Sequence, residues 1–362
     1  MTERRPRFAM VGGGENSFIG PIHRMAVRMD DLADLIDGCY SSKDDWREML
    51  ERVRGKADFI SVCTPNDSHY AISKAALEAG FDVFCEKPLS MRVEEAEELG
   101  KIAAERGRIL GIPFTYTGFP MVKLARDLVA KGELGRICKV VLEYSQGSFR
   151  KIDFTKPLDR RNAWKMDPAR SGPSCVVADI GVHAFMLTEY VTGLEVRELL
   201  ADLSSYAPGN RLDDDASILA RLAEPGAGET FAKASIVASK IATGEENGVR
   251  LRVYGEKASL FWDQESPNRL AVKRPYAPEE TWKRAAPYTA SFSEACAASS
   301  RTPAGHHEGF IEAFANIYRE FCAAVRDRKP HDFPGAREGV RSMRFVEAAL
   351  ASSAAGSTWK RL

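Results

Sequence analysis

The sequence lacks the features that mark several large classes of protein. No run of 18 consecutive apolar residues occurs, so we expect no membrane-spanning helix. The 51 Lys and Arg residues equal the 51 Asp and Glu residues, so the basic surplus typical of nucleic-acid-binding proteins is missing. Proline and glycine are not in excess, and we find no internal repeat or low-complexity segment. These absences indicate an ordinary globular protein that neither binds nucleic acid nor spans a membrane.

Cysteines are few and show no pairing pattern. The seven cysteines are odd in number, widely spaced and without any Cys-x-x-Cys pair. Disulfide frameworks and structural zinc sites need paired spacings, so we expect reduced thiols, a cytoplasmic location and no metal site. The N-terminal region also lacks an apolar segment long enough for a secretory signal.

The length and the residue pattern predict two domains. A single hydrophobic core rarely grows beyond about 300 residues, and this chain has 362. Over residues 1–120, short apolar runs alternate with helical stretches, which is typical of a parallel, doubly wound α/β sheet of the Rossmann type. The expected strands are 8–11, 35–40, 59–63, 81–85 and 109–112, and the expected helices are 19–29, 43–53, 68–79 and 93–105.

The remainder, residues 121–362, has an α+β pattern. After a helix over 119–131, seven segments separated by turn-sized gaps are strand-like, and many of them alternate apolar and polar residues, as in an open-faced, mainly antiparallel sheet. We expect one helix over 176–191, a long loop over 277–304, and closing helices over 307–325 and 337–349. We assign this half to substrate binding, and we expect the uncovered sheet face to join copies into a homodimer or homotetramer. The seven strand segments are 137–144, 196–204, 217–222, 231–239, 250–254, 259–262 and 270–273.

A glycine-rich loop follows the first expected strand, in the order Val11-Gly12-Gly13-Gly14-Glu15-Asn16-Ser17-Phe18-Ile19-Gly20. Dinucleotide-binding folds place glycines here so that the chain can turn tightly and its backbone can approach a pyrophosphate at the helix N-terminus. Gly12 and Gly14 fit the usual G-x-G-x-x-G spacing, but Ser17 occupies the third position. Gly20 can serve as the third glycine in a loop that is about three residues longer than usual.

The end of the second strand leaves the choice of dinucleotide open. An acid at this position accepts hydrogen bonds from the ribose of NAD, whereas a basic group tolerates the additional phosphate of NADP. The sequence here is Cys39-Tyr40-Ser41-Ser42-Lys43, and Asp44 and Asp45 come later. The serines and Lys43 slightly favour NADP or dual use, so we expect NAD or NADP.

Three further stretches contain candidate catalytic residues. Cys63-Thr64-Pro65-Asn66 ends the third strand and Cys85-Glu86-Lys87-Pro88 ends the fourth, at the sheet edge where doubly wound folds bind ligands. A lysine at this edge can hold or polarise a substrate hydroxyl, and we expect a cis peptide before Pro88. Asp179 and His183 are four residues apart, which places them on one helix face, and a histidine beside a carboxylate is a usable general base.

Each of these patterns has an ordinary structural alternative. A Lys-Pro turn is common on protein surfaces, and a D-x-x-x-H pair often only satisfies itself on a helix face. A metal shared by Asp179 and His183 would lack an evident third ligand. The patterns gain weight only in combination.

In this combination and order, the motifs resemble those of the glucose–fructose oxidoreductase / inositol dehydrogenase (Gfo/Idh/MocA) family, and the resemblance covers nearly the whole chain. Two departures from the family pattern are the longer glycine loop and Lys165, which stands where many relatives have arginine. Four further segments are similar to a sugar-oxidising branch, namely 18–20, 116–122, 163–168 and 305–310.

The resemblance implies an NAD(P)-dependent dehydrogenase that oxidises a secondary hydroxyl of a pyranose sugar or glycoside, with C3 as the first guess, or of a cyclic polyol such as inositol. It implies that Lys87, Asp179 and His183 form the catalytic set. We expect substrate contacts from these three residues and from Tyr116 and His306. We expect cofactor contacts from Gly12, Gly14, Phe18, Ile19, Gly20, Ser41, Ser42, Lys43, Thr64, Pro65, Asn66, His69, Glu86, Trp164 and Lys165.

Two other functions would use the same fold. A non-catalytic NAD(P)-sensing regulator needs no acid–base set, so the presence of all three catalytic candidates favours an enzyme. A reductase of ketosugars or imines would use the same residues in reverse. Tyr144 and Gln146 are further candidates for binding hydroxyls, and a basic loop over 150–170 is a candidate contact for an acidic sugar or for the cofactor phosphates.

Overall fold

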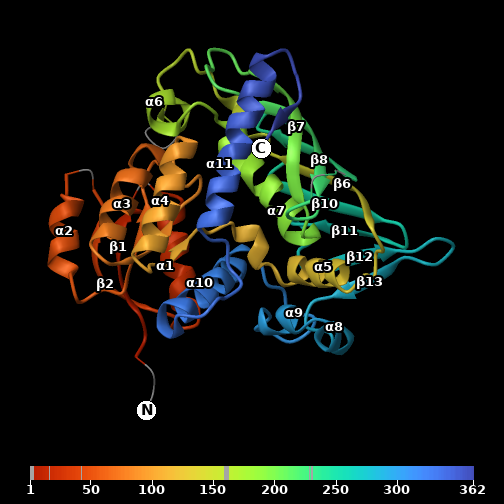
Figure 1. Ribbon diagram of the computed structural model, residues 1–362, viewed down its shortest axis with the longest axis horizontal. Coiled ribbons are helices and arrows are strands. Elements are labelled where there is room, and N and C mark those ends of the chain that lie inside the picture. The colour runs from red at the N-terminus through yellow and green to blue at the C-terminus, as the bar shows by residue number, and fades with distance from the viewer. Residues whose placement is uncertain (1–3, 16, 42, 159–162, 228, 230) are drawn as a thin grey trace. The chain divides into compact units, whose positions relative to one another are not determined.

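The computed structural model describes residues 4–15, 17–41, 43–158, 163–227, 229 and 231–362, which fold into two compact units (Figure 1). Unit 1 consists of Met1–Thr115, Leu158–Pro173 and Phe314–Met343, and unit 2 consists of Tyr116–Pro157, Ser174–Ala313 and Arg344–Leu362. Each unit therefore combines segments that lie far apart in the sequence. The domain boundary at residue 120 stays a prediction. Within the described ranges, no helix is both long enough and apolar enough to cross a lipid bilayer.

Unit 1 is built on a five-stranded parallel sheet, which confirms the predicted Rossmann-type fold. Every neighbouring pair of strands is parallel, in the order β2-β1-β3-β4-β5. In a sheet of this order, ligands bind beyond the carboxyl ends of the strands, where β1 and β3 lie side by side. The strands are β1 (Arg7–Gly12), β2 (Asp34–Cys39), β3 (Phe59–Cys63), β4 (Asp82–Cys85) and β5 (Leu110–Gly111).

Four helices connect these strands: α1 (Ile19–Met29), α2 (Trp46–Val53), α3 (His69–Glu78) and α4 (Val93–Glu105). Helices α3 and α4 pack side by side (Figure 1). Most of α10 (Phe310–Asp327) also belongs to this unit. Its Phe321 ring lies 5.1 Å from that of Phe59 and 4.7 Å from that of Phe84. A segment near the end of the chain therefore completes the core of the first sheet.

Unit 2 is built on a nine-stranded open sheet in the order β13-β12-β11-β10-β6-β9-β8-β7-β14. All neighbours are antiparallel except β6 and β9, so the predicted mainly antiparallel sheet is confirmed. The strands are β6 (Ile137–Ser145), β7 (Glu195–Ser204), β8 (Asp215–Ala223), β9 (Ala232–Ser239), β10 (Gly248–Gly255), β11 (Ser259–Asp263), β12 (Arg269–Lys273), β13 (Glu280–Lys283) and β14 (Lys360–Arg361).

Burial alternates along the sheet of unit 2. In β8, Ile218 and Ala220 are buried, whereas Leu219 between them is 49% exposed. Helix α7 (Val182–Thr192) packs against β6, β9 and β10, and α5 (Pro120–Ala130) packs against α7, β11 and β12. Nearly every residue of α7 is buried, as expected for a helix covered on all sides.

Two predictions of local structure were wrong. The segment 277–304, predicted as a long loop, contains β13, α8 (Pro287–Phe292) and α9 (Glu294–Ala298). β13 pairs with β12, which is a tertiary contact that composition does not reveal. The helix predicted over 176–191 begins instead as a π-helical turn, Val177–Gly181, which precedes α7.

Candidate active site

The glycine loop after β1 packs too closely for side chains. A Cβ atom on Gly12 would lie 2.6 Å from the carbonyl carbon of Cys63, and one on Gly14 would lie 2.3 Å from the carbonyl oxygen of Tyr40. Gly12 also has a φ of 85°, which only glycine adopts readily. The loop therefore exposes bare backbone at the carboxyl end of β1, as a bound pyrophosphate requires.

Gly20 provides the close helix packing that the third glycine of such loops provides. A Cβ atom on Gly20 would lie 2.3 Å from the Cα of Gly13. Ser17 connects the two ends of the lengthened loop by hydrogen bonds. Its N–H donates to Gly14 O at 2.9 Å, and its Oγ accepts from Gly20 N–H at 3.1 Å. The first turn of α1 has no acidic residue, so the positive end of the helix dipole is available to an anion. These residues fit a dinucleotide. Phe18, which precedes α1, is 59% exposed.

The turn after β2 is stabilised by its own aspartates. The Asp44 carboxylate accepts from the N–H groups of Tyr40 and Ser41 at 3.1 and 2.9 Å, and Asp45 caps α2 by accepting from Arg47 N–H. Ser41 and Lys43 are exposed, and Ser42 lies outside the described residues. The aspartates and the Ser41 hydroxyl, which accepts from Lys43 N–H at 3.1 Å, are thus all engaged with the main chain, while the Ser41 and Lys43 side chains remain exposed.

His69 links the turns that follow β3 and β4. Its two ring nitrogens lie 2.9 Å from the carbonyl oxygen of Thr64 and 2.8 Å from that of Pro88. The Lys87–Pro88 peptide is cis, as predicted. The predicted cofactor residues Thr64, Pro65 and His69 therefore lie at the same sheet edge as Lys87.

A buried charged pair adjoins Lys87. The Glu86 carboxylate accepts from Lys87 N–H at 3.1 Å and lies 3.0 Å from Nε2 of His23, while Nδ1 of His23 lies 2.6 Å from the hydroxyl of Tyr318. Burial alone would lower the pKa of the fully buried His23, but the Cys63 sulfur and the Glu86 carboxylate raise its pKa to about 10. His23 and Tyr318, which we did not single out in the sequence, thus support the backbone at Lys87.

Trp164 and Lys165 belong to unit 1 although they follow the first strand of the second sheet in the sequence. They lie in the 3-10 turn Ala163–Met166, where the ammonium of Lys165 is 5.8 Å from the Trp164 ring. The buried side chain of Asn66 donates to the carbonyl oxygen of Ser171 at 2.8 Å, which fixes this segment beside the end of β3. Both residues therefore stay candidates for cofactor contacts.

Two basic residues of the loop 150–170 form salt bridges with aspartates. Lys156 pairs with Asp153 at 3.1 Å, and Arg170 pairs with Asp67 at 3.3 Å. Arg160 and Arg161, which contribute to the predicted positive charge, lie outside the described residues.

In unit 2, Asp213 holds the turn that carries Asp179. Its buried carboxylate accepts from the N–H groups of Cys175 and Val177 at 2.7 and 2.9 Å and from the hydroxyl of Ser174 at 2.9 Å. π-Helical turns occur frequently at functional sites. Asp179 and His183 thus lie on a backbone whose start is fixed by three hydrogen bonds.

Asp179 forms a salt bridge that we did not predict. Its Oδ2 lies 2.5 Å from Nζ of Lys240, whose side chain is only 3% exposed. In the sequence, Lys240 follows an apolar strand, which is a common place for a surface lysine. Only the packing of the π-helical turn against β9, a strand paired on both sides, shows that this strand end is covered.

His183 adjoins a cluster of polar side chains. Its ring centroid lies 5.0 Å from that of Tyr116, edge to face, and the Tyr116 hydroxyl lies 2.7 Å from that of Tyr144. Asn247 joins both tyrosines, because its amide donates to Tyr116 at 3.0 Å and its oxygen accepts from Tyr144 at 2.8 Å. Gln146 also donates to Asn247, at 3.0 Å. The predicted hydroxyl-binding residues are thus brought together, and Asn247 is the member that sequence reasoning missed.

His306 lies on an exposed loop of unit 2. Its carbonyl oxygen accepts from the guanidinium of Arg284, and Arg284 forms a buried salt bridge of 2.9 Å with Glu308. The loop is therefore anchored, and His306 stays a predicted substrate contact.

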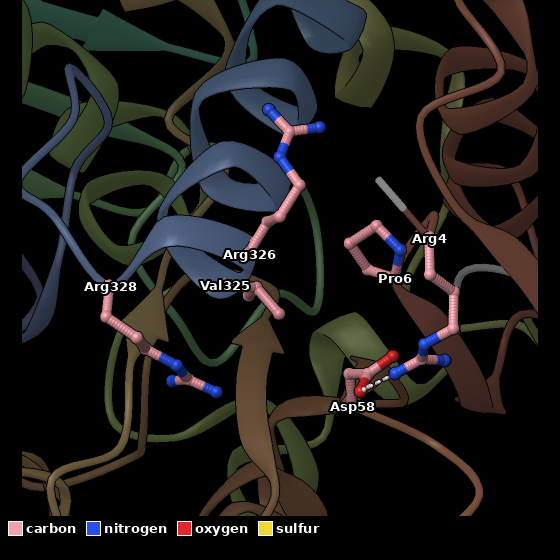
Figure 2. Close-up of a pocket in the computed structure, with 6 residues that line it drawn as sticks. All are labelled: Arg4, Pro6, Asp58, Val325, Arg326 and Arg328. Atoms are coloured by element: carbon pink, nitrogen blue, oxygen red, sulfur yellow. Dashed lines mark hydrogen bonds and ion pairs between the residues drawn. The ribbon is translucent and has the colours of Figure 1, made fainter. Parts of the chain in front are cut away.

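A hollow of unit 1 lies at the other end of the strands. It is lined by Arg4, Pro6, Asp58, Val325, Arg326 and Arg328 (Figure 2). Asp58 immediately precedes β3, and Arg4 pairs with it at 2.7 Å. Ligands of parallel sheets bind at the carboxyl ends, so we do not assign the cofactor to this hollow. In the described part of the chain, no group of three or more His, Cys, Asp or Glu side chains is arranged to hold a metal ion.

Comparison with known families identifies both halves of the chain. Residues 18–114 match the oxidoreductase family with an NAD-binding Rossmann fold, and residues 122–261 match the GFO/IDH/MocA C-terminal domain. An uncharacterized oxidoreductase of Bacillus subtilis, YfiI, is 32% identical over 98% of this chain and 96% of its own length. The D-glucoside 3-dehydrogenase of Escherichia coli is 40% identical, but over only 26% of each chain.

Solved structures agree with this assignment. The inositol dehydrogenase homologue of Azotobacter vinelandii in complex with NAD+ has a TM-score of 0.93 and 31% identity, over 100% of this chain and 98% of that one. Its complex with NADH and myo-inositol has a TM-score of 0.89, over 99% and 98% of the two chains. The predicted family and an NAD-type cofactor are confirmed: the chain belongs to the Gfo/Idh/MocA family of oxidoreductases and carries an NAD-binding Rossmann domain.

Proposed function

We propose that this enzyme oxidises a secondary hydroxyl of a cyclic polyol such as inositol, or of a pyranose sugar or glycoside at C3. The observation that supports this most is the polar cluster around His183, in which Tyr116, Tyr144 and Asn247 present hydroxyl and amide groups beside a histidine. Such groups suit a substrate with several hydroxyls, because each can donate and accept hydrogen bonds.

The relatives support the same substrate class. The structural homologue from Azotobacter vinelandii was solved with myo-inositol, and a relative over part of the chain is a D-glucoside 3-dehydrogenase. Both compounds are rings that carry adjacent secondary alcohols. A cyclic polyol and a glycoside are therefore the first two substrates to test.

Three residues carry the proposed chemistry. NAD(P), when bound, supplies the acceptor for the hydride. His183 removes the proton of the substrate hydroxyl as general base. Lys87 donates a hydrogen bond to the same oxygen and stabilises the negative charge that develops on it. Asp179 accepts a hydrogen bond from a neighbouring substrate hydroxyl or from His183.

The cofactor-binding residues follow from the glycine loop and the sheet edge. The backbone of Gly12, Gly14 and Gly20 would receive the pyrophosphate, and Ser41 with Lys43 would meet the adenosine ribose or its phosphate. Asn66 and Glu86 would lie near the nicotinamide ribose. Cofactor titrations monitored by fluorescence test this assignment independently of any substrate.

A substrate panel tests the proposed function. Purified protein with NAD or NADP is mixed with inositols, glucosides, and open-chain polyols as controls, and the formation of the reduced nicotinamide is followed by absorbance. We expect turnover of at least one ring compound and little with the open-chain polyols. Cofactor binding without any turnover, also in the reverse direction with ketosugars, would favour a sensor instead.

A further inference from the structure

Lys240 is a buried lysine with a fixed main chain. It follows β9, and its N–H donates to the carbonyl oxygen of Asp214 at 2.8 Å while its own carbonyl oxygen accepts from Phe149 N–H at 2.9 Å. Its side chain is 3% exposed. Burying an ammonium without a partner is strongly unfavourable, so its position calls for a compensating charge.

Asp179 supplies that charge. Nζ of Lys240 lies 2.5 Å from Oδ2 of Asp179 and 4.8 Å from the centroid of the Phe149 ring, whose face also attracts a cation. Cys175 and Asp213 also face the ammonium, but the Asp213 carboxylate already accepts three hydrogen bonds from the start of the π-helical turn. Asp179 is therefore the carboxylate that mainly compensates the charge of Lys240.

The pair has a chemical consequence for Asp179. A positive charge at this distance favours the ionised carboxylate. An ionised carboxylate only accepts hydrogen bonds, whereas a protonated one also donates. Burial alone would lower the pKa of Lys240, but Asp179, with Cys175 and Asp213, raises it above its ordinary value.

We propose that Lys240 is a positioning residue, which holds Asp179 as an ionised acceptor for a substrate hydroxyl and leaves His183 as the titrating base. This inference rests on the proposed function, because it assigns Asp179 a task within the same reaction. It makes Asp179 a fixed negative charge across the pH range in which His183 changes its protonation state.

The direct test is the titration of Asp179 itself. Protein labelled with ¹³C at the aspartate carboxyl carbons is followed by NMR from about pH 4 to about pH 9, a range that covers ordinary carboxyl and imidazole pKa values, and the Asp179 signal is assigned with Asp179→Asn. In the wild-type protein we expect no titration of this signal above about pH 5. A titration above that value would overturn the proposal without the need for any lysine variant.

Three lysine variants sharpen the result. Lys240→Met should raise the pKa of Asp179 by about one to three units, the usual effect of removing an adjacent opposite charge. Lys240→Arg should keep it low. Lys233→Met is the matched control, because Lys233 is an exposed lysine of β9, the strand that Lys240 follows, and its loss should leave the titration of Asp179 unchanged. An unchanged signal in Lys240→Met would overturn the proposal, and if Lys240→Met does not fold, the titration of Asp179 in the wild-type protein remains the test.

Kinetics then separate this inference from the proposed function. The pH profile of kcat/KM should show one ionisation on its acid side in the wild-type enzyme and a second one in Lys240→Met, while Lys240→Arg restores the wild-type profile. If no ring compound is oxidised, the proposed function fails, whereas the NMR titration still reports on the pair. If turnover occurs but the profile of Lys240→Met equals that of the wild type, the positioning role is wrong.

Discussion

At the scale of single residues, the enzyme surrounds two of its histidines very differently. His23 is fully buried between Glu86 and Tyr318, and its pKa is raised to about 10. His183 lies beside two tyrosines, with its ring centroid 5.0 Å from that of Tyr116 and 6.1 Å from that of Tyr144. The first histidine has the environment of a cation, and we propose the second as the group that takes the substrate proton.

His23 makes stability depend on pH in a defined direction. Its pKa is 6.5 unfolded and about 10 folded, so its contribution is fully present below pH 6.5 and is lost as the pH rises towards 10. Each pKa unit corresponds to about 1.4 kcal/mol. We predict that the free energy of unfolding of the wild type falls more steeply between these pH values than that of His23→Gln. Urea unfolding at several pH values measures both slopes, and equal slopes would contradict the charged pair.

At the scale of elements, the glycine loop gives a matched pair of variants. In Gly20→Ala, the added methyl group would meet the backbone of Gly13 at 2.3 Å, so the loop must shift. We predict at least a tenfold weaker binding of NAD, in line with about 1.4 kcal/mol per factor of ten.

The control variant is Gly100→Ala in α4, where the methyl group would meet only side chains at 3.6 Å or more. That control should bind NAD normally and be as stable as the wild type or more so. Isothermal titration calorimetry measures the affinity of both variants for NAD. An equal loss of affinity in the two variants would argue against a role of the glycine loop in binding NAD.

Most elements follow from local sequence patterns, and the exceptions have physical causes. The alternation of apolar runs and helical stretches predicted β3, α1 and α4 with the bounds that the structure has. β13 was missed because its residues become a strand only by pairing with β12. The π-helical turn was missed because it depends on Asp213, which lies far from Asp179 in the sequence and supplies the hydrogen bonds.

At the scale of the whole molecule, the open sheet of unit 2 makes self-association the natural expectation. On the outward face of this sheet, residues that are not buried lie next to one another from strand to strand. Leu219 of β8, the exposed residue described above, pairs with Leu200 of β7 on one side and with Ser235 of β9 on the other. From there the row continues through Val141, Arg252, Phe261 and Ala271.

We predict that Leu219→Glu converts a dimer or tetramer into smaller species, because burying a new carboxylate against a partner copy without a paired charge is strongly unfavourable. Tyr206→Glu, on an exposed loop, serves as the control. Light scattering coupled to size-exclusion chromatography measures the mass of each variant. A monomeric wild-type protein would rule out this role for the sheet face.

The residues of the candidate site could be predicted where they belong to short sequence motifs. The Lys87, Asp179 and His183 motifs can be found in the chain without any structure, and so can the glycine loop. Lys240, Asn247 and His23 could not be found in this way, because each acts through a partner that only tertiary packing brings near. In the sequence, a buried lysine at the end of an apolar strand cannot be distinguished from a surface lysine, because its burial depends on neighbouring elements.

We propose that Lys87 and His183 act on one substrate oxygen, and a double-mutant cycle tests this proposal most directly. kcat/KM for the ring compound found in the panel is measured for the wild type, Lys87→Ala, His183→Ala and the double variant, with the affinity for NADH as a check of folding. We predict that each single change lowers kcat/KM by about a hundredfold to ten-thousandfold with little change in NADH affinity, and that the double variant loses far less than the product of the two. Fully multiplicative losses, or wild-type turnover in either single variant, would contradict the account.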